Sequence, residues 1–276
     1  MVPTVNDIIE ELFSWAPEEL AEEWDNVGLQ VGYPHWPVKN AVIALDVTPG
    51  VLAFALQVKA DMVISHHPMI FTPLTRLDLS ETTARLLAGF LRHEISVFSM
   101  HTNLDSVPGG VNDRLASLLG LEDLEPLVEN ALVKGAGLGR VGTLERPVSA
   151  SEFVERIGTV LDRQVLAVAG ALSGPVETVA LCSGSGSSLF REAVNRGADV
   201  YVSAEIKHST AREAEARGIM VVDAGHFETE RPVVYDIEKF LSQAAKDRNW
   251  DFEVQVFEGE RSPFTFYCNS TPVRSA

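Results

Sequence analysis

The sequence is short of basic residues. Its 276 residues include 22 lysines and arginines against 39 aspartates and glutamates, for a formal net charge of −17. A surface of this charge repels the phosphates of DNA and RNA, so we expect no broad nucleic-acid-binding face. The simplest interpretation is an acidic, solvated surface, and a local basic pocket for a small anion remains compatible with it.

Cysteine and long apolar runs are also scarce. Cys182 and Cys268 stand alone rather than in a C-x-x-C pair, which argues against a zinc knuckle and a dithiol redox motif. We expect both thiols to be reduced and Cys182 to be buried. No apolar run reaches the roughly 20 residues that span a bilayer. The first residues also lack the basic and apolar regions of a signal peptide, so we expect a cytoplasmic protein without membrane association.

Strand and helix patterns alternate along most of the chain, which has the composition of a globular protein, with 46% hydrophobic and 22% charged residues. Short apolar runs rich in β-branched residues indicate strands, and amphipathic stretches indicate helices. The strands are expected at residues 41–45, 61–66, 95–100 and 164–168. The helices are expected from Thr4 or Asn6 to Trp15 and at residues 17–24, 50–58, 81–92, 111–119 and 150–162. This alternation predicts an α/β fold.

Two segments are expected to be irregular. Residues 101–110 contain Pro108, Gly109 and Gly110, which favour a loop over a helix. Residues 121–150 show no clear period and contain several glycines, so we expect a link with one or two short strands.

The second half of the chain repeats the first. Residues 44–65 and 180–203 each read strand, turn, helix, strand, and each ends in Ala-Asp-x-x-x-Ser. Further along, each half places a histidine just past a strand with a carboxylate four residues later. We therefore expect two related lobes, residues 1–125 and 126–276, in one compact unit.

The histidines at the predicted strand ends are the strongest chemical signal. Residues 61–66 read as a buried strand that stops at the adjacent pair His66 and His67, followed by Pro68. Adjacent strand residues point to opposite faces, so a pair at a fraying strand end can splay and serve two partners. Two neighbouring metal ions suit this geometry better than one. The alternative is a histidine pair satisfied by backbone hydrogen bonds.

A mixed imidazole and carboxylate set at these strand ends suits zinc, manganese or iron and disfavours calcium. We expect two divalent ions per chain, with Asp105 and Glu230 as candidate bridging groups. The alternative is that these carboxylates serve loops or helix caps beside unrelated histidines. The predicted ligands are His66, His67, Asp105, His226 and Glu230.

Other residues near these motifs have less defined roles. His101 is either a ligand or, as we expect, a neighbour that supports the site or transfers a proton. The glycine- and serine-rich segment 183–188 either holds an anion or forms a flexible turn, and the turn is favoured. Glu205, Lys207 and His208 follow a predicted strand, so each either faces the site or belongs to the next helix cap. His35 and His93 are given no role.

A series of segments resembles the NIF3 family, also known as DUF34 or YbgI-like proteins. The resemblance covers nearly the whole chain and rests on residues 24–32, 45–49, 65–68, 101–105, 109–113 and 225–230. It implies the NIF3-like fold, with two intertwined, structurally related α/β lobes and mixed sheets. It also implies a toroidal homohexamer whose metal pairs face an inner cavity, with the five ligands above and with His101 close to the metals. Ser203-Ala204-Glu205 departs from the family's usual Thr-Gly-acidic motif, and no room is left for the inserted middle domain of some relatives.

The resemblance implies a function only in outline. Family members are catalogued as GTP cyclohydrolase 1 type 2 homologues, so we expect a dinuclear metal-dependent hydrolase that uses a metal-bound hydroxide. Its substrate would be a nucleotide or another small heterocycle. The alternative is a non-catalytic metal carrier, or a hexameric scaffold for a regulatory partner.

Overall fold

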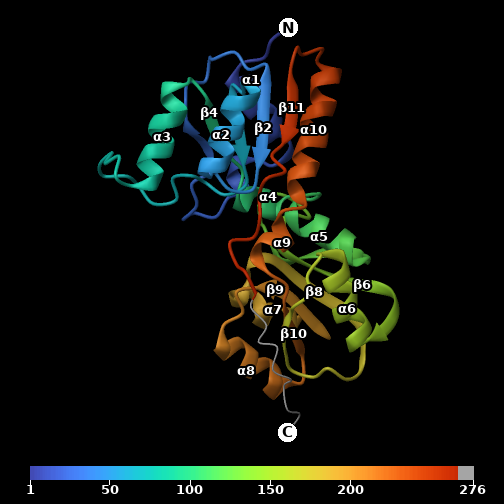
Figure 1. The fold of residues 1–276 in the computed structure, drawn as a ribbon. Helices are drawn as coiled ribbons and strands as arrows, with labels where there is room; N and C mark the ends of the chain where they lie inside the picture. Colours follow the sequence, from blue (N-terminus) through green and yellow to red (C-terminus); the bar gives the residue numbers. More distant parts are fainter. Residues whose placement is uncertain (267–276) are drawn as a thin grey trace.

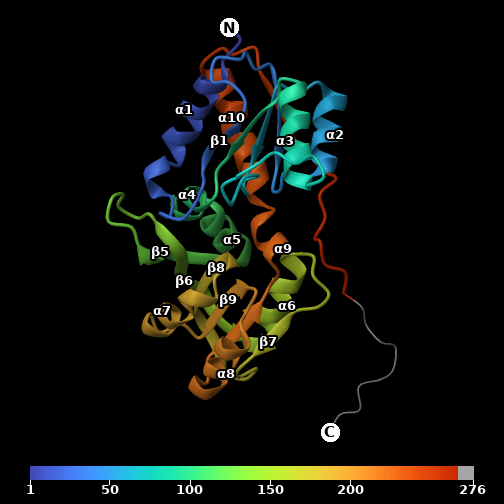
Figure 2. The same cartoon turned by 90° about the vertical axis from the view of Figure 1, so that its left-hand side faces the viewer.

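The computed structural model describes residues 1–266 and contains two β-sheets, one above the other, each covered by helices on both faces (Figure 1). A view turned by 90° shows the same two bodies joined at a narrower middle (Figure 2). Both sheets combine parallel and antiparallel strands. The predicted α/β class with mixed sheets is therefore confirmed.

The first sheet has five strands in the order β1-β4-β3-β2-β11. Only β1 runs antiparallel to its neighbour, and the other pairs are parallel. Its strands are β1 (Gly28–Val31), β2 (Asn40–Ala44), β3 (Met62–Ser65), β4 (Ser96–Ser99) and β11 (Glu253–Val256).

Helices bury both faces of this sheet, because alternate residues of its central strands are apolar on each side. Ile43 and Ile64 pack with α1 (Val5–Trp15) and α10 (Val233–Asp247). On the opposite face, Val42 and Val63 pack with α2 (Pro49–Val58) and α3 (Thr82–Arg92). Helix α1 begins where the sequence predicts, at a capping box in which Thr4 and Asp7 satisfy each other's backbone amides.

The second sheet has six strands in the order β5-β6-β8-β9-β10-β7. The central strands β8, β9 and β10 are parallel, and the three outer pairings are antiparallel. Its strands are β5 (Leu121–Glu129), β6 (Gly137–Ser149), β7 (Ala167–Ala169), β8 (Pro175–Ser185), β9 (Val200–Ala204) and β10 (Met220–Asp223).

This sheet repeats the layering of the first. One face packs against α5 (Val111–Leu119) and α6 (Ala150–Val160). The other packs against α7 (Phe190–Asn195) and α8 (His208–Arg217). Between the sheets lie two short helices, α4 (Thr102–Ser106) and α9 (His226–Glu230). Short 3-10 helices cover Glu18–Leu20 and Ser187–Leu189.

The chain returns to the first sheet after completing the second. Helix α10 packs on the first sheet, and β11 pairs in parallel with its strand β2. The sequence predicted two lobes that follow one another along the chain, residues 1–125 and 126–276. In the structure, α10 and β11 belong to the later part of the chain but lie with the first sheet. The reason is that β2 offers an open edge, and β11 pairs there with Val254 and Val256 packed on the core of the first sheet.

Three local expectations differ from the structure. Residues 102–106 form helix α4 rather than a loop, since Asn103 donates to the Ala16 carbonyl at 2.8 Å and Leu104 is fully buried. The predicted helix at 17–24 shrinks to one 3-10 turn, because the Glu22 amide donates to Thr102 instead. Residues 121–149 form two long strands, whose glycines permit close strand contact: a side chain at Gly139 would lie 2.6 Å from the Leu181 carbonyl oxygen.

Candidate metal centre

The carboxyl ends of the parallel strands in both sheets meet at the junction between them. In the first sheet, His66 and His67 follow β3 and His101 follows β4. In the second, Glu205 follows β9 and His226 lies three residues past β10. Ligand sites in α/β proteins gather at such strand ends, so the topology concentrates these side chains at one place.

Helices α4 and α9 carry the two matched motifs. Each begins at a histidine, His101 as the N-cap of α4 and His226 as the first residue of α9. The carboxylate four residues later, Asp105 or Glu230, therefore lies on the same face of the helix as its histidine. Gly225 precedes α9 at φ 86°, where a side chain would meet the Arg163 guanidinium at 1.9 Å. The turn into α9 thus requires glycine.

The five predicted ligands come together around Glu230. Its Oε2 lies 3.0 Å from Nε2 of His67 and 3.0 Å from Nε2 of His226. The Nε2 atom of His66 lies 3.7 Å from Asp105 Oδ1 and 3.9 Å from Glu230 Oε2. Residues from both sheets therefore contribute to one cluster.

Three overlapping groups of side chains in this cluster could hold a metal ion. Within each group, the ligand atoms lie within 4.8 Å of one another. The groups are His66, His67 and His101; His67, His226 and Glu230; and His66, Asp105 and Glu230. His101 thus lies beside the predicted ligands, which is compatible with both roles considered for it.

Each histidine of the cluster is oriented by a partner at its other ring nitrogen. The Nδ1 atom of His66 contacts the Met100 carbonyl oxygen at 2.9 Å. The Nδ1 atoms of His67, His101 and His226 each contact one carboxylate oxygen at 2.8 Å. The carboxylates are those of Asp46, Asp25 and Glu205, respectively. A proton on Nδ1 leaves the Nε2 lone pair free toward the cluster, as metal-binding histidines require.

Three polar atoms at the centre are buried without a hydrogen-bond partner: His66 Nε2, Asp105 Oδ1 and Glu230 Oε2. Burying such groups unpaired costs free energy, and a cation coordinated by all three would remove that cost. Imidazole nitrogens combined with carboxylate oxygens are donors for zinc, iron and manganese. The residues present therefore fit a divalent transition metal.

The electrostatics favour the deprotonated, metal-binding forms of His66 and Glu230. Burial lowers the pKa of His66 to about 3, which keeps the ring neutral. Burial alone would raise the pKa of Glu230, but the close approach of the His226 and His67 rings lowers it well below its usual range. Burial, and then the charge of Glu230, raise the pKa of Asp105 to about 7. A nearby cation would therefore stabilise the charged form of Asp105.

A cavity of about 660 Å³ opens on one side of the cluster. Asp105, His101 and Glu230 line its floor, and Trp24 and Phe71 stand at its edge with 59% and 54% of their areas exposed. The two aromatic rings are 5.9 Å apart. Among the described residues, no lysine or arginine lines this cavity.

Of the three residues after β9 whose role the sequence left open, only Glu205 hydrogen-bonds to a histidine of the cluster. Glu205 orients His226, whereas Lys207 and His208 sit at the start of α8 and belong to none of the three metal-binding groups. In the segment 183–188, the amides of Ser183, Gly184 and Gly186 donate to the side chains of Asn112, Thr229 and Ser203. These amides are therefore not available to an anion, and the segment acts as a structural turn.

Asp25 and Asp46 are site residues that the motif analysis did not identify as such. Asp25 lies 76 residues before His101, and Asp46 lies 21 residues before His67. Each belongs to a segment that resembles the family, which was the only sequence signal for either. Cys182 is buried as expected, and burial raises its pKa far above the usual value. Cys268 lies outside the described residues.

No helix within residues 1–266 is long and apolar enough to cross a membrane.

Comparisons with known proteins agree with this architecture. Curated relatives named GTP cyclohydrolase 1 type 2 homolog are 30% identical in Streptococcus pneumoniae and 32% in Clostridium acetobutylicum. The alignments cover 94% and 95% of this chain, and 98% of each relative. The structure of reduced HcgD from Methanocaldococcus jannaschii matches with a TM-score of 0.79 at 32% identity, over 94% of this chain and 99% of that one. A Bacillus cereus protein related to NIF3 matches with a TM-score of 0.90 at 24% identity, over 97% of this chain and all of that one. The model of the Duf34/NIF3 (NGG1p interacting factor 3) family matches residues 3–263, and the chain belongs to that family.

Proposed function

We propose that the chain binds two divalent transition-metal ions, zinc, iron or manganese, and that it is a metal-dependent hydrolase. One observation carries the metal proposal. Four histidines have Nδ1 engaged outside the cluster, while three central ligand atoms are buried without partners. The proposed ligands are His66, His67, Asp105, His226 and Glu230, and Glu230 belongs to both of the candidate groups that contain a carboxylate.

Bound ions of this kind would lower the pKa of water and polarise the bond to be cut. The chain's own residues orient the histidine rings of the site. Asp46 and Glu205 fix the rings of His67 and His226, and the buried Met100 carbonyl fixes His66. Asp25 holds His101 with its Nε2 toward the cavity, a position from which it can exchange a proton with a bound substrate.

The cavity walls favour a planar, weakly charged substrate. Trp24 and Phe71 offer exposed aromatic surface within 6.1 and 6.3 Å of the His101 ring, measured between ring centroids. A small heterocycle could pack against them. The relatives' name, GTP cyclohydrolase 1 type 2 homolog, supports a nucleotide or related heterocycle. The absence of lysine and arginine from the described cavity lining favours a substrate without a triphosphate.

The same lack of basic residues favours a second candidate, a non-catalytic metal carrier or a scaffold for a regulatory partner. The lining carries the carboxylates of Glu22, Asp105 and Glu230. Such a surface attracts cations and repels phosphate-bearing substrates, as a metal carrier would require.

A substrate screen tests the hydrolase. Protein loaded separately with zinc, iron and manganese would be incubated with GTP, guanosine, guanine and other purines, and products would be separated by chromatography. We expect turnover of at least one compound and its loss in Glu230→Gln. Rapid exchange of an isotopically labelled metal, with no turnover of any compound, would instead support the carrier.

We also propose, from the family resemblance, that the chain assembles as a toroidal homohexamer in the cytoplasm. Only two cysteines among 276 residues are consistent with a reducing compartment.

A further inference from the structure

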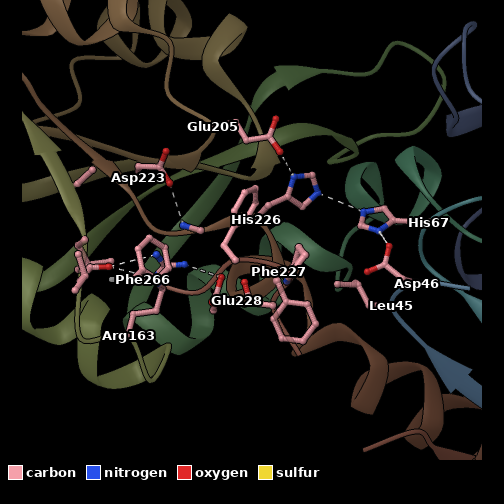
Figure 3. A pocket seen from close by; sticks show the side chains of 17 residues that line it. Leu45, Asp46, His67, Arg163, Glu205, Asp223, His226, Phe227, Glu228 and Phe266 are labelled. Carbon is pink, nitrogen blue, oxygen red and sulfur yellow. Dashed lines mark hydrogen bonds and ion pairs between the residues drawn. The ribbon is translucent and has the colours of Figure 1, made fainter. Parts of the chain in front are cut away.

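A second cavity, of about 520 Å³, lies on the other side of His67 and His226. These two histidines line both cavities, so their rings form the partition between them. The second cavity extends from His67 and His226 toward Arg163 and Phe266 (Figure 3). Its volume lies within the ~300–1,000 Å³ range of small-molecule sites.

The walls of this cavity are mainly apolar and come from three separate segments. Val165 and Leu166 lie just before β7, and Phe227 belongs to α9. Pro263 and Phe264 come from the segment that follows β11.

This last segment, residues 257–266, runs from the first sheet to the second and is fixed at both ends. Near its start, the Glu260 carboxylate accepts hydrogen bonds from the amides of Leu45 and Asp46 at 2.8 to 2.9 Å. At its end, the Phe266 ring lies 4.6 Å from the guanidinium carbon of Arg163. The wall is therefore held in place by specific contacts.

The charges around the cavity are mainly negative. Its described lining includes four carboxylates and one arginine, and Arg163 is already paired with Glu228 at 2.8 Å. Asp46 and Glu205 each use one oxygen to hold a histidine and are about half exposed. The second oxygen of each can accept a hydrogen bond from an N–H group. The carboxylates outnumber the one arginine, and this balance disfavours an anion here.

We propose that this second cavity binds an uncharged or cationic organic molecule with an apolar body and an N–H group at the end near Asp46 and Glu205. The apolar body would lie between Val165 and Phe264. This site is distinct from the proposed hydrolytic cavity, and its occupancy requires neither catalysis nor bound metal.

Two fluorescent dyes that differ in one charge test the proposal. N-phenyl-1-naphthylamine is neutral and carries an N–H group, and 8-anilinonaphthalene-1-sulfonate adds a sulfonate to the same rings. Both would be titrated into the full chain, once with zinc and once with EDTA. We expect saturable fluorescence with one neutral dye per chain in both conditions. The sulfonate should bind at least about tenfold more weakly, because like charges placed together cost several kcal/mol.

A pair of matched variants, one in each cavity, shows which cavity holds the dye. Val165→Trp would fill the second cavity from a partly exposed position, and Leu138→Trp would place the same side chain in the first cavity. We expect Val165→Trp to weaken neutral-dye binding at least about tenfold, by occupying the volume that the ligand needs. Leu138→Trp should leave it unchanged. Phe264→Asp, on a side chain that is 72% exposed, provides a second test at another part of the wall with little effect on folding.

The outcomes are distinct. Equal binding of the two dyes would overturn the charge argument, and neutral-dye binding that survives both Val165→Trp and Phe264→Asp would overturn the location. Absence of neutral-dye binding would overturn the site itself. None of these results bears on metal content or turnover, so the proposed function stands or falls separately.

Discussion

At the scale of single residues, Glu230 is the side chain at the centre of the candidate metal site. Its buried Oε2 lies 3.0 Å from ring nitrogens of both His67 and His226, and it shares a further group with His66 and Asp105. Glu228, two residues earlier on the same helix, points elsewhere and pairs with Arg163. The chain therefore provides its own control for the charge of Glu230.

Replacing Glu230 with glutamine should remove at least one of two metal equivalents. The amide keeps the size of the side chain but loses the anionic oxygen that two candidate groups share. Metal content would be measured by elemental analysis after reloading and gel filtration. Glu228→Gln should keep about two equivalents, as the parent protein does under the two-ion proposal. A parent value that stays near one would contradict the dinuclear centre.

His101→Ala should behave differently from the ligand variants. We expect both ions to remain and any hydrolytic rate to fall by about 10- to 100-fold, the usual effect of removing a supporting residue beside a metal. Elemental analysis and turnover would be measured on the same preparation. Because His101 also belongs to a candidate group with His66 and His67, loss of an ion in this variant would show that it coordinates.

The ionised carboxylate of Asp105 should lower the stability of the metal-free protein at neutral and higher pH. Its pKa rises from 3.8 to about 7 on folding, through burial and the charge of Glu230. The folded state therefore holds more protons than the unfolded state between these values, and this contribution to stability falls as pH rises through that window. In EDTA at pH 8, Asp105→Asn should melt at least about 2–4 °C above the parent, equivalent to about 1 kcal/mol for a large domain. At pH 4 the difference should vanish, and an equal gain at both pH values would contradict the titration argument.

At the scale of secondary-structure elements, the turn at the end of β8 supports α9. Gly184 has φ 58°, and a side chain there would lie 2.0 Å from Glu230 Oε1. Its amide also donates to Thr229 at 3.0 Å, which fixes the distance between the strand and the helix. The glycine thus leaves room for the ligand carboxylate.

Gly184→Ala should weaken metal binding at least about tenfold, because even small displacements of supporting groups reduce metal affinity. Gly197→Ala is the matched control: Gly197 has a similar φ of 71°, and apart from its chain neighbours no residue lies within 4 Å of the position its side chain would take. Both variants carry the backbone strain of alanine at positive φ, and only the first contacts Glu230. Competition with a fluorescent zinc chelator would measure both affinities, and equal losses would show that strain alone is responsible.

The elements that the sequence predicted best are those whose signals are local. Thr4 caps α1, and the buried run from Met62 to Ser65 ends at the two histidines, as expected. Helix α4 was missed because the contacts that stabilise it come from Ala16 and Asp25, more than 70 residues earlier. Asp25 escaped notice for the same reason, and Asp46 also lies far from its partner in sequence, 21 residues before His67. Pairings across such separations leave no periodic pattern in a single sequence.

At the scale of the whole molecule, the proposed ring is the property that most affects access to the metal centre. In the single chain, the segment 71–81 exposes Leu74, Leu77 and Leu79 to solvent. Apolar side chains gathered on one exposed segment are typical of contacts between subunits. A closed ring could cover such surface.

Light scattering coupled to gel filtration should give about six times the 30.1 kDa mass of one chain. Replacing Leu77, which is 60% exposed, with aspartate should lower that mass if the segment lies at a subunit contact. Leu172→Asp is the matched control, because Leu172 lies outside this segment and has a similar exposure of 59%. It should keep the mass of the parent protein, and a monomer mass for the parent itself would contradict the ring.

The return of β11 to the first sheet has a consequence for synthesis on the ribosome. Strands β2, β3 and β4 emerge early, but the edge partner of β2 arrives only at residues 253–256. Between these events the entire second sheet must be made, and it contributes His226 and Glu230. A nascent chain therefore holds His66, His67 and Asp105 long before their counterparts exist. Domains generally fold as units during translation, and this one reaches completion only when almost the whole chain has left the exit tunnel.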